Sequence, residues 1–349
     1  MNNLYIIMPG NVSKKFHSFI QKITHNIDKT TINNKYNIPD LKNKKILFAI
    51  ELDECGFNIP LYEIFLNLYE KGNDSLLGSN GIIIIQSPNE LYTKNTSQNI
   101  IFLANQIGCS FIGHSVVEAT GNLNNFLTWQ KRLNMSLEDI HLYLSKKLIH
   151  NFIKKEFSII TKPKILALHA SSHKTSNTLM LWNMIKKHLH NCHIEEFHVE
   201  NGTITDCKGC SYITCKHYSE NKSCFYGGII TKELLPSIEK ADCIIWICPN
   251  YNDAISAKLM AVINRLTVLY RRTKFYDKTF FSIIVSGNSG SDCVAKQLIG
   301  ALNINKGFRL PPYFSIMATA NNPGSIKKVP NIEKKAEQFA SHILKEIKK

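Results

Sequence analysis

Residues 164–185 read KILALHASSHKTSNTLMLWNMI, and this stretch decides the fold. The apolar run KILALHA predicts a buried strand over residues 164–170, and the polar residues after it predict a turn. Leu181 and Ile185 then continue a helical spacing of apolar residues, so we expect a helix to begin near Asn177. A strand, a turn and a helix in this order are typical of an α/β protein with a parallel sheet.

The same alternation continues toward the C-terminus. Further strands are predicted at residues 193–200, 242–249, 280–287 and 314–319, with helical patterns between them. The run DCIIWICP is continuously apolar, as expected of a strand that is buried on both faces. Five such strands predict a flavodoxin-like, doubly wound parallel sheet with the strand order 2-1-3-4-5.

Length and composition suggest two globular domains. The chain has 349 residues, of which 44% are hydrophobic and 20% charged, and this excludes a disordered or fibrous protein. No apolar run approaches the ~18 residues needed to cross a bilayer, and the first residues lack the order of a signal peptide. We therefore expect a cytoplasmic protein with no membrane partner.

The charge is uneven along the chain. The net charge is +15, from 42 Lys and Arg against 27 Asp and Glu. Residues 1–160 hold 16 basic and 13 acidic side chains, whereas residues 161–349 hold 26 and 14. We expect an anionic ligand in the more basic half, and no nucleic-acid partner, because the lysines are scattered rather than clustered.

The first half of the chain resembles the second. At an offset of 199, residues 84–122 share 11 identities in 39 positions with residues 283–321. KIL at residues 45–47 also matches KIL at residues 164–166, but at an offset of 119. The difference of 80 between the two offsets predicts that the first copy lacks 80 residues, including its second and third strands. Chance similarity between two strand-helix-strand units is the alternative.

We predict that residues 1–160 form a degenerate flavodoxin-like companion domain without a cofactor. The missing segment would contain the parts that bind a ligand. The loop that would follow its first strand carries Glu51, Asp53 and Glu54, and these carboxylates would repel a phosphate. The second domain, residues 161–349, is then expected to hold the ligand.

The turn after the strand at 164–170 is a candidate phosphate site. It offers free backbone N–H groups, hydroxyls, a lysine and the positive end of a helix dipole to one small volume. Its candidate ligand-binding residues are Ser171, His173, Lys174, Ser176, Asn177 and Thr178. A Ser/Thr turn that only caps the helix is the alternative. The turn matches neither a P-loop nor GxGxxG.

Two further loops are expected beside this turn, because ligands of doubly wound sheets bind beyond the carboxyl ends of the strands. The first contains Pro249, Asn250, Tyr251 and Asn252, whose amides could bond a heterocycle and whose tyrosine could stack on it. The second contains Ser286, Gly287, Asn288, Ser289 and Gly290, where the glycines permit close approach to a flat ligand. Plain surface turns are the alternative for both loops.

In these features the chain resembles the NADPH-dependent FMN reductase family, over about residues 163–347. The family's G-S-x-R-x-x-S-N-T phosphate loop corresponds to residues 170–178, where Ala170 replaces the glycine and His173 the arginine. A P-x-Y loop and the helix after it correspond to residues 249–251 and 256–265. The resemblance implies an FMN-binding oxidoreductase of flavodoxin-like fold.

In such an enzyme FMN would be held non-covalently, reduced by NAD(P)H and reoxidised by a second substrate, a small molecule or a protein. The cofactor carries the chemistry, so the resemblance implies no catalytic side chain, and Tyr251 is expected to be a contact rather than an acid. The nicotinamide coenzyme, NADH or NADPH, the acceptor and a homodimer remain open at this point.

Four of the ten cysteines lie in one loop, with the spacing C-x2-C-x4-C-x8-C. Cys207, Cys210, Cys215 and Cys224 could together bind an iron–sulfur cluster or a zinc ion, or remain free thiols or a redox disulfide. The loop is similar to the cysteine segment of iron–sulfur flavoproteins, although its second and third cysteines are further apart. This similarity implies an alternative function, an FMN and iron–sulfur electron carrier that serves a protein partner. A sensor of a phosphate-bearing ligand is a third hypothesis.

Overall fold

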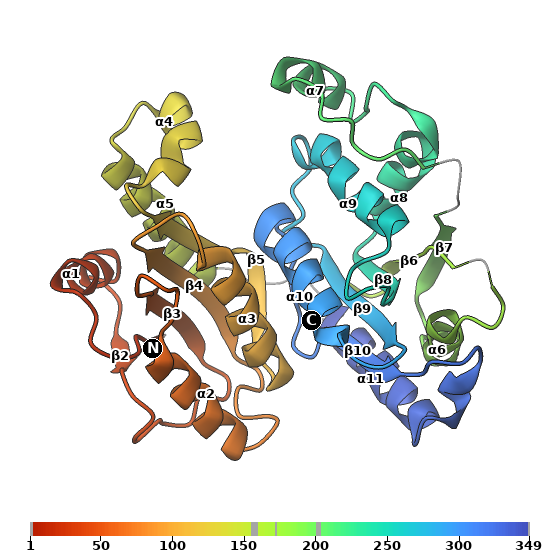
Figure 1. The fold of residues 1–349 in the computed structure, drawn as a ribbon, viewed down its shortest axis with the longest axis horizontal. Coiled ribbons are helices and arrows are strands. Elements are labelled where there is room, and N and C mark those ends of the chain that lie inside the picture. The colour runs from red at the N-terminus through yellow and green to blue at the C-terminus, as the bar shows by residue number, and fades with distance from the viewer. Residues whose placement is uncertain (1–2, 155–159, 172, 200–203, 348–349) are drawn as a thin grey trace. The chain divides into compact units, whose positions relative to one another are not determined.

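The computed structural model describes residues 3–154, 160–171, 173–199 and 204–347. The chain divides into two compact units, Met1–Glu156 and Phe157–Lys349. Each unit contains one five-stranded parallel sheet with helices on both faces (Figure 1). None of the helices in the described ranges combines the length and the apolar character that crossing a bilayer requires.

The sheet of the second unit has the predicted strand order. Its strands are β6 (Lys164–His169), β7 (His193–His198), β8 (Cys243–Pro249), β9 (Thr279–Ser286) and β10 (Ser315–Thr319). They lie in the order β10-β9-β8-β6-β7 and pair in parallel, which is the flavodoxin-like order 2-1-3-4-5. Every residue of β8 and β9 is buried, as the apolar runs predict for central strands covered on both faces.

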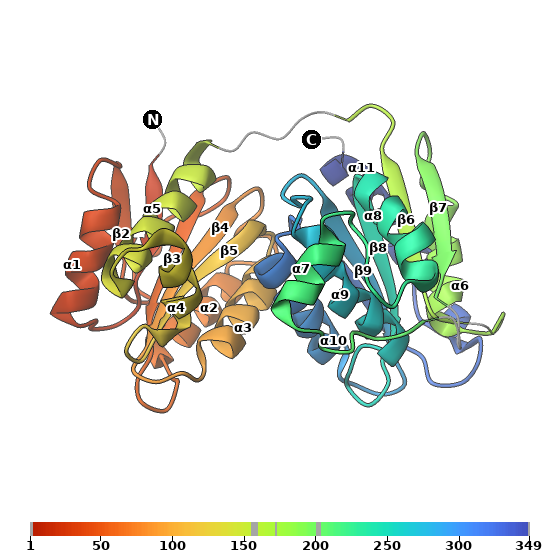
Figure 2. The ribbon, with the colours of Figure 1, turned by 90° about the horizontal axis from the view of Figure 1, so that it is seen from above.

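Two layers of helices cover this sheet. On one face α6 (Asn177–Lys186) and α11 (Ile332–Ile347) pack Trp182 and Phe339 into a core shared with Ile245. The other face carries α8 (Leu235–Lys240), α9 (Ala257–Tyr270) and α10 (Ser291–Leu298) (Figure 2). The remaining described elements are α7 (Tyr212–Ser219), the π-helical segments Ile230–Leu234 and Ile299–Lys306, and the 3-10 turn Ser325–Lys328.

The first unit repeats this topology with a complete sheet. Its strands are β1 (Leu4–Ile7), β2 (Lys29–Ile32), β3 (Lys45–Glu51), β4 (Asn80–Ser87) and β5 (Ser110–Thr120), in the order β2-β1-β3-β4-β5. One face is covered by α1 (Lys14–Ile23) and α5 (Leu137–Lys154), which share a core with β1, β3 and β4. The other helices are α2 (Ile59–Glu70), α3 (Thr93–Gln106), α4 (Leu127–Leu133) and the 3-10 turn Asn124–Phe126.

The predicted deletion in the first unit is wrong, although the offset of 199 agrees with the structure. That offset places β4 on β9 residue for residue. KIL at residues 45–47, however, begins the third strand of its sheet, whereas KIL at residues 164–166 begins the first. The first strand is instead Leu4–Ile7, whose four residues are too few to stand out in the sequence. The described residues of the first unit thus include all five strands of its sheet.

A buried ion pair anchors the last helix of the second unit. The guanidinium of Arg309 lies 2.9 Å from the carboxylate of Glu346 on α11 and also donates to the Glu346 carbonyl oxygen at 3.0 Å. Both residues are almost fully buried, with 6% and 2% of their surface exposed. Burial lowers the pKa of Arg309, and the Glu346 carboxylate opposes that shift. The charge on each residue is therefore stable in the core only while the other is present.

We expect Arg309→Met to destabilise the second unit by about 3–5 kcal/mol, because it leaves a buried carboxylate without its counter-ion. Urea unfolding of the full chain, followed by tryptophan fluorescence, measures the change: Trp182 and Trp246 are fully buried in this unit. Lys296→Met is the control, since the pair Lys296–Asp292 is partly exposed and should contribute less than about 1 kcal/mol. Equal losses in the two variants would contradict the prediction.

Candidate functional site

Three loops of the second unit lie at one edge of its sheet. They follow β6, β8 and β9, which are neighbouring parallel strands, so their carboxyl ends point the same way. These loops contain the residues that the sequence analysis selected, namely 171–178, 249–252 and 286–290. The fold therefore brings the three predicted segments to one edge, which is where doubly wound sheets bind ligands.

The loop after β6 is a helix-capping turn with an exposed cationic segment. Ser176 is the N-cap of α6: its hydroxyl accepts the Leu179 N–H at 3.4 Å, and its own N–H donates to the His173 carbonyl oxygen at 3.0 Å. His173 and Lys174 are exposed, and Lys174 makes no ion pair with any described residue. Ser172 lies outside the described residues. The turn thus caps the helix and still leaves a lysine available for an anion.

Asn177 has a structural role that the sequence did not reveal. Its side-chain amide donates to the carbonyl oxygens of Ala320 and Asn322, both at 2.9 Å, and accepts the Ile326 N–H at 3.1 Å. These bonds fix the segment after β10 beside the turn, and Gly324 adds a bond to the Thr175 carbonyl oxygen. Thr178 is buried at the start of the helix.

The loop after β8 is a tight turn that holds Tyr251 out of the core. Tyr251 and Ala254 exchange backbone hydrogen bonds of 3.4 and 3.2 Å across Asn252 and Asp253. These two central residues have φ values of 53° and 55°, which Asn and Asp tolerate better than most residues. The Tyr251 side chain remains 60% exposed, so its ring can contact a ligand.

Asn250 connects this loop to the one after β9. Its amide nitrogen lies 2.8 Å from the Ser289 carbonyl oxygen and 3.1 Å from both the Ser286 hydroxyl and the Asp253 carboxylate. Its amide oxygen is buried and accepts no hydrogen bond from any described residue. A buried acceptor without a donor is costly, and the N–H group of a bound ligand could satisfy it.

Gly290 allows the two loops to approach this closely. Its φ is 82°, and a Cβ atom there would lie 1.7 Å from the Asp253 carboxylate and 3.0 Å from the Asn250 amide nitrogen. Nearby, the hydroxyls of Ser286 and Ser291 are 2.6 Å apart. A side chain at position 290 would therefore force the loops apart.

Sequence reasoning missed Gln297, which positions this turn. The Gln297 side chain accepts the Ile255 N–H at 3.1 Å and donates to the Asp253 carbonyl oxygen at 3.0 Å. The signal was present, since Gln297 is one of the residues shared with the first half of the chain, where Gln98 matches it.

A pair of histidines beneath the turn was also missed. His169 and His198 are register partners at the ends of β6 and β7, and their rings stack with centroids 4.7 Å apart. Burial and the neighbouring His198 lower the pKa of His169, against weaker opposing effects of Ser171 and Glu196. The available signal was a histidine within two residues of the end of each of these predicted strands.

The four-cysteine loop does not gather its sulfurs into a metal centre. All four cysteines are free, and no group of three or more His, Cys, Asp or Glu in the described residues is arranged to hold a metal ion. The pKa of Tyr226 is raised by lost solvation and by Cys210, which is hydrogen-bonded to its phenol, with smaller effects of Cys224 and Cys207. One thiol of the loop, that of Cys210, thus contacts the Tyr226 phenol, while Cys215 lies on α7.

Arg265 of α9 holds both ends of the cysteine loop. Its guanidinium, almost fully buried, donates to the carbonyl oxygens of Thr205 at 3.1 Å and Gly227 at 2.6 Å. The preceding Asn264 bonds the Asp206 carboxylate at 3.0 Å. The ends of the loop are therefore fixed to the same helix that follows the Tyr251 turn.

Solved structures of similar fold cover about half of this chain. One is an FMN-dependent NADH-azoreductase from Bacillus anthracis in complex with FMN, with 14% identity and a TM-score of 0.40; the match covers 52% of this chain and 99% of that one. Another is an NAD(P)H:quinone oxidoreductase from Methanothermobacter marburgensis, with 15% identity and a TM-score of 0.40, covering 52% and 94%. No curated protein matches the chain.

A comparison with protein families gives a match that includes all three loops. Residues 163–322 match the family described as NADPH-dependent FMN reductase. The match begins just before β6 and ends after β10, so it spans the whole sheet of the second unit. Over residues 163–322, just under half of its length, the chain is therefore similar to the NADPH-dependent FMN reductase family.

Proposed function

We propose that the chain is an oxidoreductase that binds FMN at the three loops of its second unit, accepts hydride from NAD(P)H and passes electrons to a small-molecule or protein acceptor. The observation that carries this proposal is the buried, unpartnered amide oxygen of Asn250 beside the exposed ring of Tyr251. A flavin ring offers both a flat face and an N–H donor, so it suits these two groups.

The turn at residues 171–178 would hold the phosphate of FMN. The first N–H groups of α6 have no partner within the helix, and they point toward the turn together with the positive end of the helix dipole. Lys174 adds a formal charge, with Ser171, His173 and Ser176 as further donors. His173 stands where the family has arginine, so Lys174 is the turn's one permanently charged side chain.

The other two loops would hold the ring. The Asn250 oxygen would accept a ring N–H, and Tyr251 would lie against the ring, with Asn252, Asn288 and Ser289 at the rim. Bound there, FMN would supply the redox chemistry, taking hydride from the nicotinamide and returning electrons to the acceptor. The protein's own contribution is binding and orientation, and no side chain is assigned an acid or base role.

A second candidate is an electron carrier that combines FMN with an iron–sulfur cluster and serves a protein partner. The hydrogen bond between Cys210 and Tyr226 and the Arg265 contacts favour it, because they anchor the cysteines in one short loop. The sulfurs as placed do not form a ligand set, and a cluster would require the loop to close further. We therefore assign no step to a cluster.

Flavin bleaching under anaerobic conditions separates the two candidates. The reductase should bind FMN with a yellow absorbance spectrum, and NADPH or NADH alone should bleach it. A carrier would bind FMN but would not be bleached, and would contain iron when purified without oxygen. A protein that gains no flavin spectrum with added FMN would contradict both proposals.

Lys174→Met should weaken FMN binding about tenfold or more, because it removes a charge-assisted bond to the phosphate. Riboflavin, which lacks the phosphate, should bind the variant and the wild type equally. Lys187→Met, at the other end of α6, is the matched control and should leave both affinities unchanged. Fluorescence titration measures the affinities of both variants for FMN and for riboflavin. Equal weakening of FMN and riboflavin would place the phosphate elsewhere.

Gly290→Ala should separate the loops after β8 and β9 and weaken FMN binding. The added Cβ would clash with Asp253, which typically costs about 1–3 kcal/mol, and the positive φ would add about 1–2 kcal/mol of strain. Gly209→Ala is the control: Gly209 also has a positive φ, 68°, but nothing lies within 4 Å of its added Cβ. Thermal unfolding and FMN titration of both variants measure the difference, and similar FMN affinities would contradict the prediction.

A further inference from the structure

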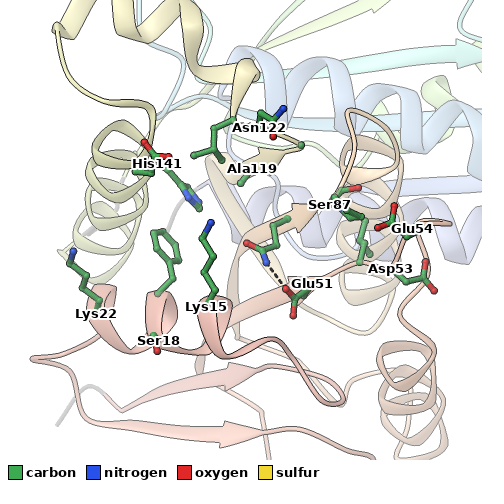
Figure 3. Close-up of a pocket in the computed structure, with 17 residues that line it drawn as sticks. Lys15, Ser18, Lys22, Glu51, Asp53, Glu54, Ser87, Ala119, Asn122 and His141 are labelled. Atoms are coloured by element: carbon green, nitrogen blue, oxygen red, sulfur yellow. Dashed lines mark hydrogen bonds between the residues drawn. The ribbon is translucent and has the colours of Figure 1, made fainter.

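The first unit contains a cavity of about 820 Å³ at the carboxyl edge of its sheet (Figure 3). Residues at the ends of β3, β4 and β5 form one wall, and side chains of α1 and α5 form the other. The cavity therefore lies at the sheet edge that corresponds to the proposed FMN site of the second unit. Nothing in the proposed function uses it.

The first unit fills its own phosphate position with a carboxylate. Ser13 is the N-cap of α1, as Ser176 is of α6. The Glu51 carboxylate, at the end of β3, accepts the Ser13 N–H at 2.5 Å, the Ser13 hydroxyl at 2.7 Å and the Gln86 amide at 2.5 Å. A ligand phosphate at this helix end would meet a negative charge. This contact supports the proposal that the first unit does not bind FMN.

A buried histidine faces the same cavity without a partner. His141 of α5 has 6% of its surface exposed, and its ring stacks on Phe19 at 4.1 Å and on Phe126 at 5.5 Å between centroids. Its Nε2 atom makes no hydrogen bond with any described residue. Burial, and secondarily the charge of Lys15, lower the pKa of His141 to about 4. The imidazole is thus neutral at physiological pH, with one polar atom unsatisfied.

Two lysines of α1 line the cavity near this histidine. Lys15 and Lys22 are seven residues apart and so share a face of the helix. Neither forms an ion pair with a described residue. Lys15 extends into the cavity between His141 and Glu51 (Figure 3). An anion bound here could neutralise the Lys15 ammonium and form a hydrogen bond with the His141 imidazole. It would therefore stabilise both groups.

We propose that this cavity binds a small organic anion, with its carboxylate or phosphate group between the Lys15 ammonium and the His141 Nε2 atom and its remaining atoms in the cavity. The Phe19 ring beside His141 offers an apolar surface for that remainder. The site differs from the proposed FMN site, because the anion is held by side chains and not by the helix N-terminus.

The acidic residues of the cavity are compatible with this ligand. Glu51 already accepts three hydrogen bonds, and one Asp53 oxygen accepts the N–H groups of Cys55 and Phe57 at 2.9 and 2.8 Å. Asp53 and Glu54 lie at the end of the cavity away from His141 (Figure 3). Glu138, one turn before His141 on α5, is exposed to solvent. The anionic group is therefore expected at the Lys15 end alone.

The test is an NMR titration of the full chain labelled at its histidines. Benzoate and inorganic phosphate are the anionic probes, and benzamide is the neutral probe of the same shape as benzoate. We expect at least one anion to shift the His141 ring signals and benzamide to leave them unchanged. The signals of His150, which is exposed on the same helix, should not move. Millimolar concentrations of both anions without a His141 shift would overturn the proposal.

Lys15→Met should weaken binding of the responding anion about tenfold, because it removes a charge-assisted bond. Lys14→Met is the matched control, since Lys14 does not line the cavity. Equal weakening by both variants would show a general charge effect and would overturn the site. Lys15→Met should bind FMN with the same affinity as the wild type. Failure of the anion site can therefore be distinguished from failure of the proposed FMN function.

The pH dependence gives a second readout that a merely structural histidine would not produce. A bound anion should raise the pKa of His141 from about 4, so benzoate should bind more tightly as the pH falls from neutral toward the pKa of the bound state. His141→Phe, which can keep the ring stack with Phe19 and Phe126, should remove this dependence. A dependence that persists in the variant would exclude His141 from the site.

Discussion

The parallel pairing of β8 with β6 on one side and β9 on the other is the constraint on which the proposed site depends. Parallel strands end at the same edge, so three loops that are far apart in the chain must emerge together. Asn250 then connects the second loop to the third through its amide nitrogen, and Gly290 leaves the space for that contact. Backbone pairing of the strands thus brings the loops together, and the Asn250 side chain fixes two of them to each other.

The two units use one topology in different ways. Both place a capping serine at the start of the helix after the first strand, where an anion is favoured. In the second unit Ser176 caps this helix, and the exposed Lys174 lies in the same turn. In the first unit Glu51 occupies the position favoured for an anion, and the lysines and the buried His141 lie further along the edge. A single carboxylate at the end of β3 thus makes the two helix starts chemically different.

The cysteine loop shows how a local pattern can be ambiguous until its anchors are known. The spacing alone allowed a cluster, zinc or free thiols. The structure adds that α9 holds both ends of the loop through Arg265, and that Cys210 is hydrogen-bonded to the Tyr226 phenol. The Arg265 contacts do not follow from the spacing, because Thr205 and Gly227 lie 60 and 38 residues from Arg265 in the sequence.

The sequence by itself determined the strand order of the second unit and its three loops, because continuous apolar runs mark buried parallel strands and polar turns follow each run. It also showed the relation between the units through the shared offset of 199. It misplaced the first strand of the first unit, since four residues carry little periodic signal. Only the tertiary structure decided which polar atoms are satisfied. Asn177 bonds the segment after β10 and Glu51 caps α1, whereas one atom each of Asn250 and His141 has no partner among the described residues. Hydrogen-bond partners distant in sequence are set by how the strands and helices pack, and no local pattern encodes them.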